Sequence, residues 1–180
     1  MSRQSSSFAP AARLLHWLMA VLLLAMLFIG VGMLSTLSAW HSTLLAIHKP
    51  LGVLLLLLWV LRLLVRWRQA PPPLPADLPD WQRWGASCSH ALLYGLMLVL
   101  PLVGWAMQGA AGYPLLLAGW ALPALPALVA PDPQLYAGLR LAHGYLAYLL
   151  FALIVLHLAA GLYHGLIRRD GVLASMTGGR

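Results

Sequence analysis

The chain has 180 residues, of which 62% are hydrophobic and only 8% are charged. A soluble globular domain carries roughly 25% charged residues, so this composition excludes a water-covered domain and makes membrane lipid the main solvent of the folded chain. The net charge of +7 comes from basic residues near the ends of apolar runs, which indicates membrane topology and not a nucleic-acid-binding patch.

Four apolar runs are each long enough to cross a bilayer, which takes about 20 helical residues. They cover about residues 14–37, 44–66, 84–107 and 139–167. A proline-rich linker, Ala70 to Pro79, separates the second run from the third; it cannot be helical and must leave the bilayer. These runs predict an all-α, integral membrane four-helix bundle that forms one domain over residues 1–180.

Two segments allow another interpretation. Tyr113 to Ala130 is uncharged and long enough for a fifth span, but Pro114, Pro123 and Pro126 interrupt it. Interior prolines break helices, so they favour an interfacial or partly embedded loop. The first run could be a cleaved signal peptide, although its apolar stretch is longer than a typical signal sequence has.

The basic residues predict the orientation of the four spans. With four spans, both termini and the proline-rich linker lie on one side of the membrane. That side collects Arg3, Arg13, Arg62, Arg66, Arg68, Arg83, Arg168, Arg169 and Arg180. The other side has only Lys49 and Arg140. The positive-inside rule makes the first side cytoplasmic, and a fifth span would reverse the placement of Arg168 and Arg169.

Histidine is the unusual residue of this chain, with seven copies against four acidic residues. Ionisable side chains inside membrane helices are costly and are therefore candidates for function. His41 falls in the short connection between the first two spans, where we expect it to be solvated. The other six lie within or at the ends of spans: His16, His48, His90, His143, His157 and His164.

The spacing of His143 and His157 points to two stacked cofactors. They are 14 residues apart in the fourth span, which returns the side chain to within about 40° of its first direction after a rise of about 21 Å. Two imidazoles at such different depths cannot share one ion, but each can serve its own cofactor. Haem fits, because its iron takes an axial imidazole from each face and a four-helix bundle supplies ligands from facing helices.

The depth of each histidine in the membrane predicts which two histidines share a haem. His48 and His143 both lie at the outer ends of their spans, where they would hold an outer haem. His16 lies at the cytoplasmic end of the first span and would hold an inner haem with His157. His164 matches the depth of His16 better, but His143 and His164 would place the haems about 31 Å apart, which is poor for electron transfer between them.

Other polar residues are candidates for contacts to a quinone or to haem propionates. His90 and His164 have no axial role in this scheme, and the alternative is that both face lipid headgroups. Arg13, Arg62 and Arg66 could bind propionates, because arginine matches carboxylates with two hydrogen bonds. Anchoring to lipid phosphate is the other explanation for these three arginines.

The motifs in this order resemble the bacterial cytochrome b561 family, whose members are four-helix, di-haem b proteins of the inner membrane. The first two spans contain R-L-L-H-W-L-M-A from Arg13 and I-H-K-P-L-G followed by L-R-L-L-V-R. The third and fourth contain H-A-L-L-Y-G-L-M-L-V-L-P-L-V-G-W from His90, then H-G-Y-L-A-Y and L-H-L-A-A-G-L-Y-H. The resemblance covers the chain except for the loop near 113–133.

This resemblance implies that His16, His48, His143 and His157 are the axial ligands of two b-type haems. It also implies electron exchange with the quinone pool, ubiquinone above all, and an outer donor such as superoxide or a periplasmic redox partner. Where the family often has a second histidine after the position of His164, this chain has Gly165.

Two other functions compete with a quinone-linked oxidoreductase. The chain could be the haem-b anchor subunit of a larger periplasmic oxidoreductase, without a substrate of its own. It could also be a transporter that uses histidine to carry protons or divalent metal. The absence of glutamate, of aspartate within the spans and of paired discontinuous segments argues against a transporter.

Overall fold

The computed structural model describes residues 7–36, 38–69, 71–113 and 125–178. These residues form α1 (Pro10–Ser35), α2 (Ala39–Arg68), α3 (Asp80–Ala110), α4 (Pro133–Leu162), the π-helix η1 (Tyr163–Arg168) and α5 (Val172–Thr177). Because η1 continues α4, four helical segments of the described chain are long and apolar enough to cross a membrane. The prediction of an all-α membrane four-helix bundle is confirmed.

Local sequence explains where the helices begin. Pro10 and Pro133 lie in the first turns of α1 and α4, where the N–H that proline lacks would have no partner within the helix. Asp132 caps α4 by accepting hydrogen bonds from two backbone N–H groups of its first turn. Ser38 caps α2 in the same way. These side chains satisfy N–H groups that the helix itself leaves unpaired.

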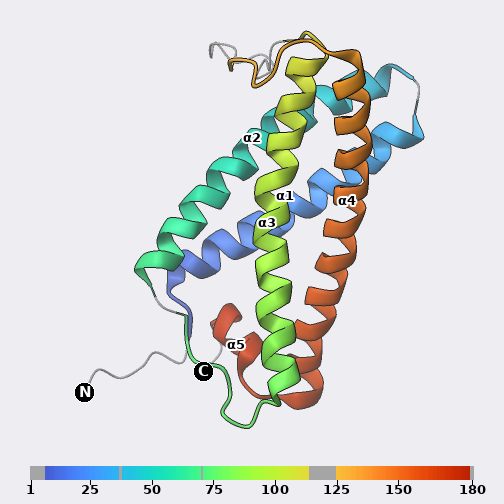
Figure 1. Cartoon of the computed structure of the whole chain (residues 1–180). Coiled ribbons are helices and arrows are strands. Elements are labelled where there is room, and N and C mark those ends of the chain that lie inside the picture. The colour runs from blue at the N-terminus through green and yellow to red at the C-terminus, as the bar shows by residue number, and fades with distance from the viewer. Residues whose placement is uncertain (1–6, 37, 70, 114–124, 179–180) are drawn as a thin grey trace.

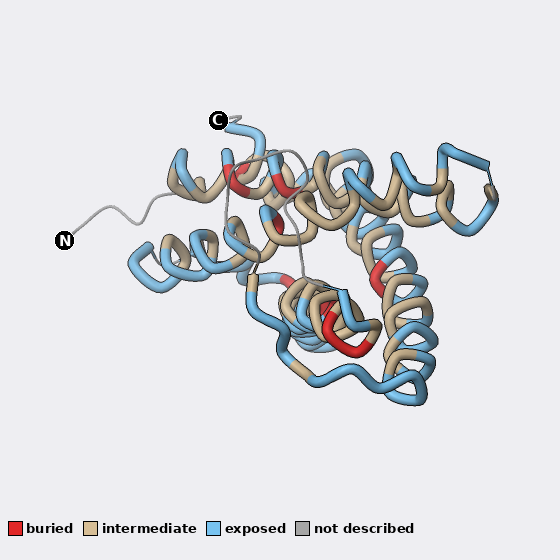
Figure 2. Tube along the Cα trace, turned by 90° about the horizontal axis from the view of Figure 1, so that it is seen from above, coloured by how far each residue is buried: buried red, intermediate tan, exposed pale blue. Residues whose placement is uncertain are grey.

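The four spans pack as two pairs of helices. α1 packs mainly against α2, and α3 packs against α4, while α2 also contacts α3. Figure 1 shows α1 crossing behind α3 and α4 at a steep angle, whereas α3 and α4 run side by side. Leu96, Leu100 and Leu150 form a small buried cluster between α3 and α4. Figure 2 shows that the outward faces are exposed, and their many large apolar side chains suit contact with lipid.

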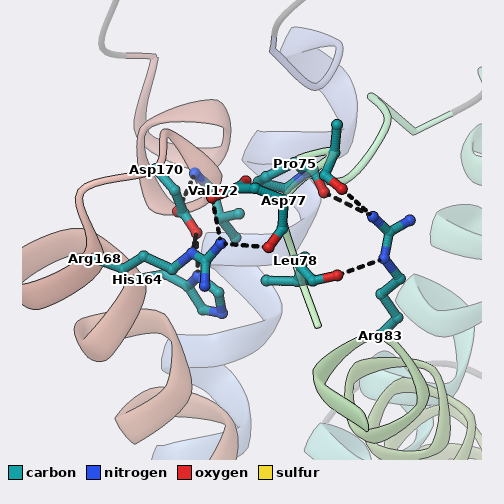
Figure 3. A network of polar contacts seen from close by, with 9 residues as sticks. Pro75, Asp77, Leu78, Arg83, His164, Arg168, Asp170 and Val172 are labelled. Carbon is teal, nitrogen blue, oxygen red and sulfur yellow. Dashed lines mark hydrogen bonds and ion pairs between the residues drawn. The ribbon is translucent and has the colours of Figure 1, made fainter. Parts of the chain in front are cut away.

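The linker between α2 and α3 is fastened to the start of α3. Residues 71–79 are not helical, as the prolines predict, and Ala70 lies outside the described residues. The Arg83 guanidinium donates hydrogen bonds to the carbonyl groups of Pro75, Ala76 and Leu78, with distances of 3.1, 2.8 and 2.9 Å. Figure 3 shows these bonds on one side of the linker. They hold the linker at the end of the molecule where α5 also lies (Figure 1).

The connection between α3 and α4 folds back over the end of α3. The Trp105 indole N–H donates to the carbonyl of Pro126 at 2.9 Å. A Cβ atom at Gly109 would lie 2.7 Å from the carbonyl oxygen of Val129, so the close approach of the two backbones requires glycine. Residues 125–131 are not helical. Residues 114–124, the main part of the segment weighed as a fifth span, lie outside the described residues.

The expectation that His41 is solvated in a loop is wrong. α2 begins at Ala39, so His41 belongs to its first turn. Its Nδ1 donates a hydrogen bond of 3.0 Å to the carbonyl of Met33. Met33 lies in the last turn of α1, where carbonyl groups have no partner within the helix. The imidazole therefore joins the end of α1 to the start of α2.

Candidate functional site

His48 of α2 and His143 of α4 lie together at the end of the bundle that holds the α1–α2 connection. Their ring centres are 6.1 Å apart and their planes are inclined by 65°. The Nδ1 atom of each ring is buried and makes no hydrogen bond to the described residues. The Leu100 carbonyl lies beside the His143 ring but outside hydrogen-bond geometry with Nδ1. Two such polar groups inside a membrane bundle are costly unless they bind something.

This separation fits one metal ion between the two rings. A metal–imidazole bond is about 2.0–2.1 Å long, so two imidazoles on opposite sides of one ion have ring centres about 6 Å apart. Within the described residues, no group of three or more His, Cys, Asp or Glu side chains could hold a metal ion. A donor set of two imidazoles suits haem, because the macrocycle supplies the remaining ligands.

Glycines lie next to both rings of this outer pair. A Cβ atom at Gly104 of α3 would lie 3.3 Å from Cε1 of His143. One at Gly30 of α1 would lie 3.9 Å from Cε1 of His48. The absence of a side chain at these positions lets each ring pack directly against the backbone of a neighbouring helix. Neither glycine is distinguished in the sequence as a contact of a histidine.

Three histidines from three helices gather at the opposite end of the bundle. The ring centre of His157 in α4 is 6.2 Å from that of His16 in α1, with planes inclined by 74°. It is also 5.4 Å from the ring centre of His90 in α3, with planes inclined by 66°. The His16–His157 separation matches that of the outer pair. His90, to which no axial role was assigned, thus lies directly beside a predicted ligand.

His164 does not join this cluster. It lies in η1, and its Nδ1 donates a 2.6 Å hydrogen bond to Oδ2 of Asp170 (Figure 3). The ring against His16 is that of His157, whereas His164 faces Asp170. Depth alone made His164 the better match for His16, but the structure places His157 there. The ring of His164 is largely covered, with its side chain 16% exposed.

Asp170 is the centre of a polar network at the end of the bundle that holds η1 and α5. Arg168 places Nε 2.9 Å from Asp170 Oδ2, at ion-pair distance but without hydrogen-bond geometry. The backbone N–H of Val172 donates to the other carboxylate oxygen at 3.2 Å. Burial raises the pKa of the Asp170 carboxyl, but the hydrogen bonds from His164 and Val172 and the nearby Arg168 charge outweigh it and hold this pKa below its usual value. The carboxylate is therefore ionised at neutral pH.

Arg168 also joins this network to the linker. Its Nη2 donates a 2.7 Å hydrogen bond to Oδ2 of Asp77, as Figure 3 shows. The Asp77 side chain is 79% exposed, so this ion pair contributes little to stability. The network thus has a largely covered part, formed by His164, Arg168 and Asp170, and one exposed member, Asp77.

The three candidate arginines have different surroundings. Arg62 donates to Nδ1 of His16 at 3.2 Å and to the hydroxyl of Tyr94 at 3.1 Å. The Arg66 guanidinium lies over the Tyr94 ring, 5.7 Å from its centre. Arg13 lies away from the imidazole pairs, with its guanidinium against Gly178 after α5. Only Arg62 touches a predicted axial ligand.

Tyr94 of α3 makes polar contacts with Arg62 and Trp59 of α2. Its hydroxyl accepts the hydrogen bond from Arg62, and its backbone carbonyl accepts one of 3.0 Å from the Trp59 indole N–H. A small cleft lies beside these groups. Its lining includes Arg62, Arg66, Gln69 and Tyr94, with Phe8 and Met176 on the apolar side. A single tyrosine in an apolar helix does not indicate, from sequence alone, that it binds an arginine or lines a cleft.

The chain is similar to proteins of one family over almost its whole length. The model of a protein family described as prokaryotic cytochrome b561 matches residues 7–179. The chain is 32% identical to cytochrome b561 homolog 2 of Escherichia coli K12 over 169 residues, which cover 91% of this chain and 87% of that protein. It is 27% identical to cytochrome b561 homolog 1 of the same organism over 172 residues, or 94% and 96% of the two chains.

Proposed function

Since the chain belongs to the prokaryotic cytochrome b561 family and is a multi-pass bacterial membrane protein that binds b-type haem and transfers electrons, we propose that it carries two haems in one four-helix domain. His48 and His143 would ligate an outer haem, and His16 and His157 an inner one. The observation that carries this proposal is the matched separation of the two pairs, 6.1 and 6.2 Å between ring centres. Each pair joins a helix of the α1–α2 pair to α4.

The residues of the chain have defined tasks in this scheme. When bound, haem supplies one-electron redox chemistry at iron. Each imidazole must be neutral to ligate iron, and the apolar interior of the bundle favours the neutral form. The leucine-rich helices keep water and ions away from the two pairs. His143 and His157 lie at different depths of α4, so the two haems would provide one redox site in each half of the membrane.

We propose further that electrons enter at the outer pair and leave at the inner pair. The donor would be superoxide or a periplasmic redox partner, and the acceptor would be a quinone, ubiquinone in particular. His90 and the cleft beside Arg62 and Arg66 support an exit at the inner end, since they offer polar contacts next to His157 and His16. His164 donates from Nδ1 to Asp170, so its Nε2 is available to exchange a proton with a quinone.

The orientation is part of the proposal. The chain would lie in the bacterial inner membrane with both termini in the cytoplasm. The contact of the N-terminal segment with α5 and the contact of η1 with the linker support it, because these segments all lie at one end of the molecule (Figure 1). Most of the basic residues belong to these segments and to the adjoining helix ends, which is the distribution that the positive-inside rule requires.

The number of haems per chain tests the ligand assignment. The dithionite-reduced-minus-oxidised spectrum of the purified protein, with haem and protein quantified together, should give two bis-imidazole b haems. His48→Gln and His143→Gln should each leave one haem, while His41→Gln should keep both because His41 contacts only helix ends. Retention of both haems in His48→Gln or His143→Gln would contradict the outer pair.

Turnover separates a quinone oxidoreductase from an anchor subunit. A protein with two haems should be reduced by superoxide or a periplasmic redox protein and reoxidised by ubiquinone analogues in liposomes. Two intact haems without either reaction would favour the anchor subunit, which would exchange electrons only with its own partner.

A further inference from the structure

Arg62 holds His16 in a particular protonation pattern. One of its terminal nitrogens, Nη2, lies 3.2 Å from Nδ1 of His16. A guanidinium has only donors and stays protonated in proteins, so Nδ1 must accept this hydrogen bond. A neutral imidazole has one N–H. His16 in this structure therefore carries its proton on Nε2.

The same guanidinium is held firmly by two further groups. Its Nε donates to the Tyr94 hydroxyl at 3.1 Å, and its Nη1 donates to the Ala12 carbonyl at 3.4 Å. These contacts come from α3 and α1, so Arg62 of α2 is fixed from two neighbouring helices. The hydrogen bond to His16 is consequently part of a built arrangement and not the chance position of a mobile side chain.

This arrangement conflicts with metal ligation by His16. An imidazole that binds iron through Nε2 must carry its proton on Nδ1, and that N–H would then point at the N–H groups of Arg62. If iron were bound through Nδ1, Arg62 would have to leave this nitrogen altogether. In either case the Arg62 guanidinium and the iron compete for one neutral imidazole.

We propose that Arg62 keeps His16 from ligating iron, by occupying Nδ1 and holding the proton on Nε2, and that it releases this ring when the inner haem binds. The inference rests on the proposed role of His16 as an axial ligand. Tyr94 retains the guanidinium through Nε after release, and the freed terminal nitrogen can then bind an oxyanion such as a haem carboxylate. The outer pair has no such residue, because Nδ1 of His48 and of His143 makes no hydrogen bond in the described structure.

The tautomer of His16 can be measured directly. The full chain, labelled with 15N-histidine and reconstituted without haem in lipid nanodiscs, reports the protonated nitrogen of each ring by NMR, and His16→Gln assigns the His16 signals. We expect protonation at Nε2 in the wild type and a mixture of tautomers in Arg62→Met. Arg68→Met is the matched control, because Arg68 ends the same helix and makes no hydrogen bond to His16.

Haem association provides a second measurement. In a His48→Gln background, which leaves only the inner site, Arg62→Met should speed the rise of the Soret band by about tenfold, the effect of removing one hydrogen bond to a charged group. Tyr94→Phe should act in the same direction but more weakly, and it serves if Arg62→Met does not fold. Arg68→Met should leave the rate unchanged.

Protonation of His16 at Nδ1 in the haem-free wild type would overturn the inference, as would equal association rates in the Arg62→Met and Arg68→Met variants. Persistence of the Arg62–His16 hydrogen bond after haem binding would overturn it as well. These outcomes differ from failure of the proposed function. If the His48→Gln parent shows no bis-imidazole haem, the ligand assignment itself is wrong. If that spectrum is normal but Arg62→Met leaves the tautomer of His16 unchanged, only the proposed role of Arg62 is wrong.

Discussion

Gly104 determines how closely α3 approaches the ring of His143. A Cβ atom there would meet Cε1 at 3.3 Å, which is tighter than ordinary packing, and Nδ1 at 3.7 Å, which is an ordinary contact. Both atoms belong to a ring that is enclosed by α2, α3 and α4. A glycine in a membrane helix usually permits close contact between helices; here it permits contact between a helix and an imidazole.

Gly104→Ala should therefore weaken outer haem binding. The added methyl group must push the His143 ring by a few tenths of an ångström, and overpacking of this kind costs about 1–3 kcal/mol, which corresponds to about 5-fold to 150-fold in affinity. Haem titration of the detergent-purified variant measures the effect, with the inner haem as internal reference. Gly95→Ala in the same helix is the control, because no atom lies within 4 Å of its added Cβ. Equal haem affinities in the two variants would show that the ring has room to move.

At the scale of elements, η1 and α5 form a cap on the end of the bundle that also holds the α2–α3 linker. η1 is a π-helix, and Arg169 follows it in the left-handed conformation with φ of 52°. This turn brings Asp170 back against His164. α5 packs mainly against η1 and α4, and the Trp17 indole N–H of α1 donates to the Met176 carbonyl at 3.1 Å. The Leu173 side chain of α5 lies against Gly165 of η1, so apolar and polar contacts together hold the short helix.

The cap should loosen in acid. The pKa of Asp170 is lower in the folded protein than its usual value, so its ionised form stabilises the cap fully above about pH 4 and this stabilisation is lost as the pH falls through the lower, folded-state pKa. Hydrogen exchange of the amides of residues 171–178, corrected for intrinsic rates, should therefore accelerate below about pH 4.

Asp170→Asn tests the contribution of the Asp170 charge to the stability of the cap apart from the contributions of neighbouring charges. It should raise the exchange rate of the cap already at neutral pH and remove its acid dependence, since the hydrogen bonds of a charged acceptor are worth about 1.5–3 kcal/mol. Asp77→Asn should change little, because Asp77 bonds the same Arg168 from a largely exposed position and such pairs contribute about 0–1 kcal/mol. Identical exchange in both variants would contradict the role of Asp170.

At the scale of the whole molecule, both chain ends and the α2–α3 linker meet at one end of the bundle. The backbone N–H of Phe8 donates to the Ser175 carbonyl at 3.1 Å, and Arg168 binds Asp77 of the linker. The α1–α2 connection lies at the opposite end (Figure 1). Four spans require this arrangement, because an even number of crossings returns the chain to its starting side.

Reporter fusions test the orientation that the charges predict. Alkaline phosphatase needs disulfides and is active only in the oxidising periplasm. Fused after Arg180 it should be inactive, and inserted into the connection at 36–38 it should be active. A cytoplasmic fluorescent protein fused at the same two places should give the opposite pattern. Activity of the phosphatase at the C-terminus would reverse the orientation or require a fifth span.

The sequence by itself determined the spans, the all-α class and the set of histidines worth testing. A run of about 20 apolar residues can satisfy its backbone groups in lipid as a helix, so composition and run length identify the spans. The helical period places His143 and His157 on one face of α4. The axial roles of these residues stay predictions, to be tested by haem stoichiometry.

Only the tertiary structure decided what each of these side chains contacts. Whether His157 or His164 meets His16 depends on how α1 crosses α4 and on the π-helix that turns His164 toward Asp170. The bond from Arg62 to Tyr94 and the fit of His143 against Gly104 join helices that are distant in sequence. Periodicity gives the face and depth of a residue on its own helix, but the rotation and approach of neighbouring helices come from packing, which no single segment encodes.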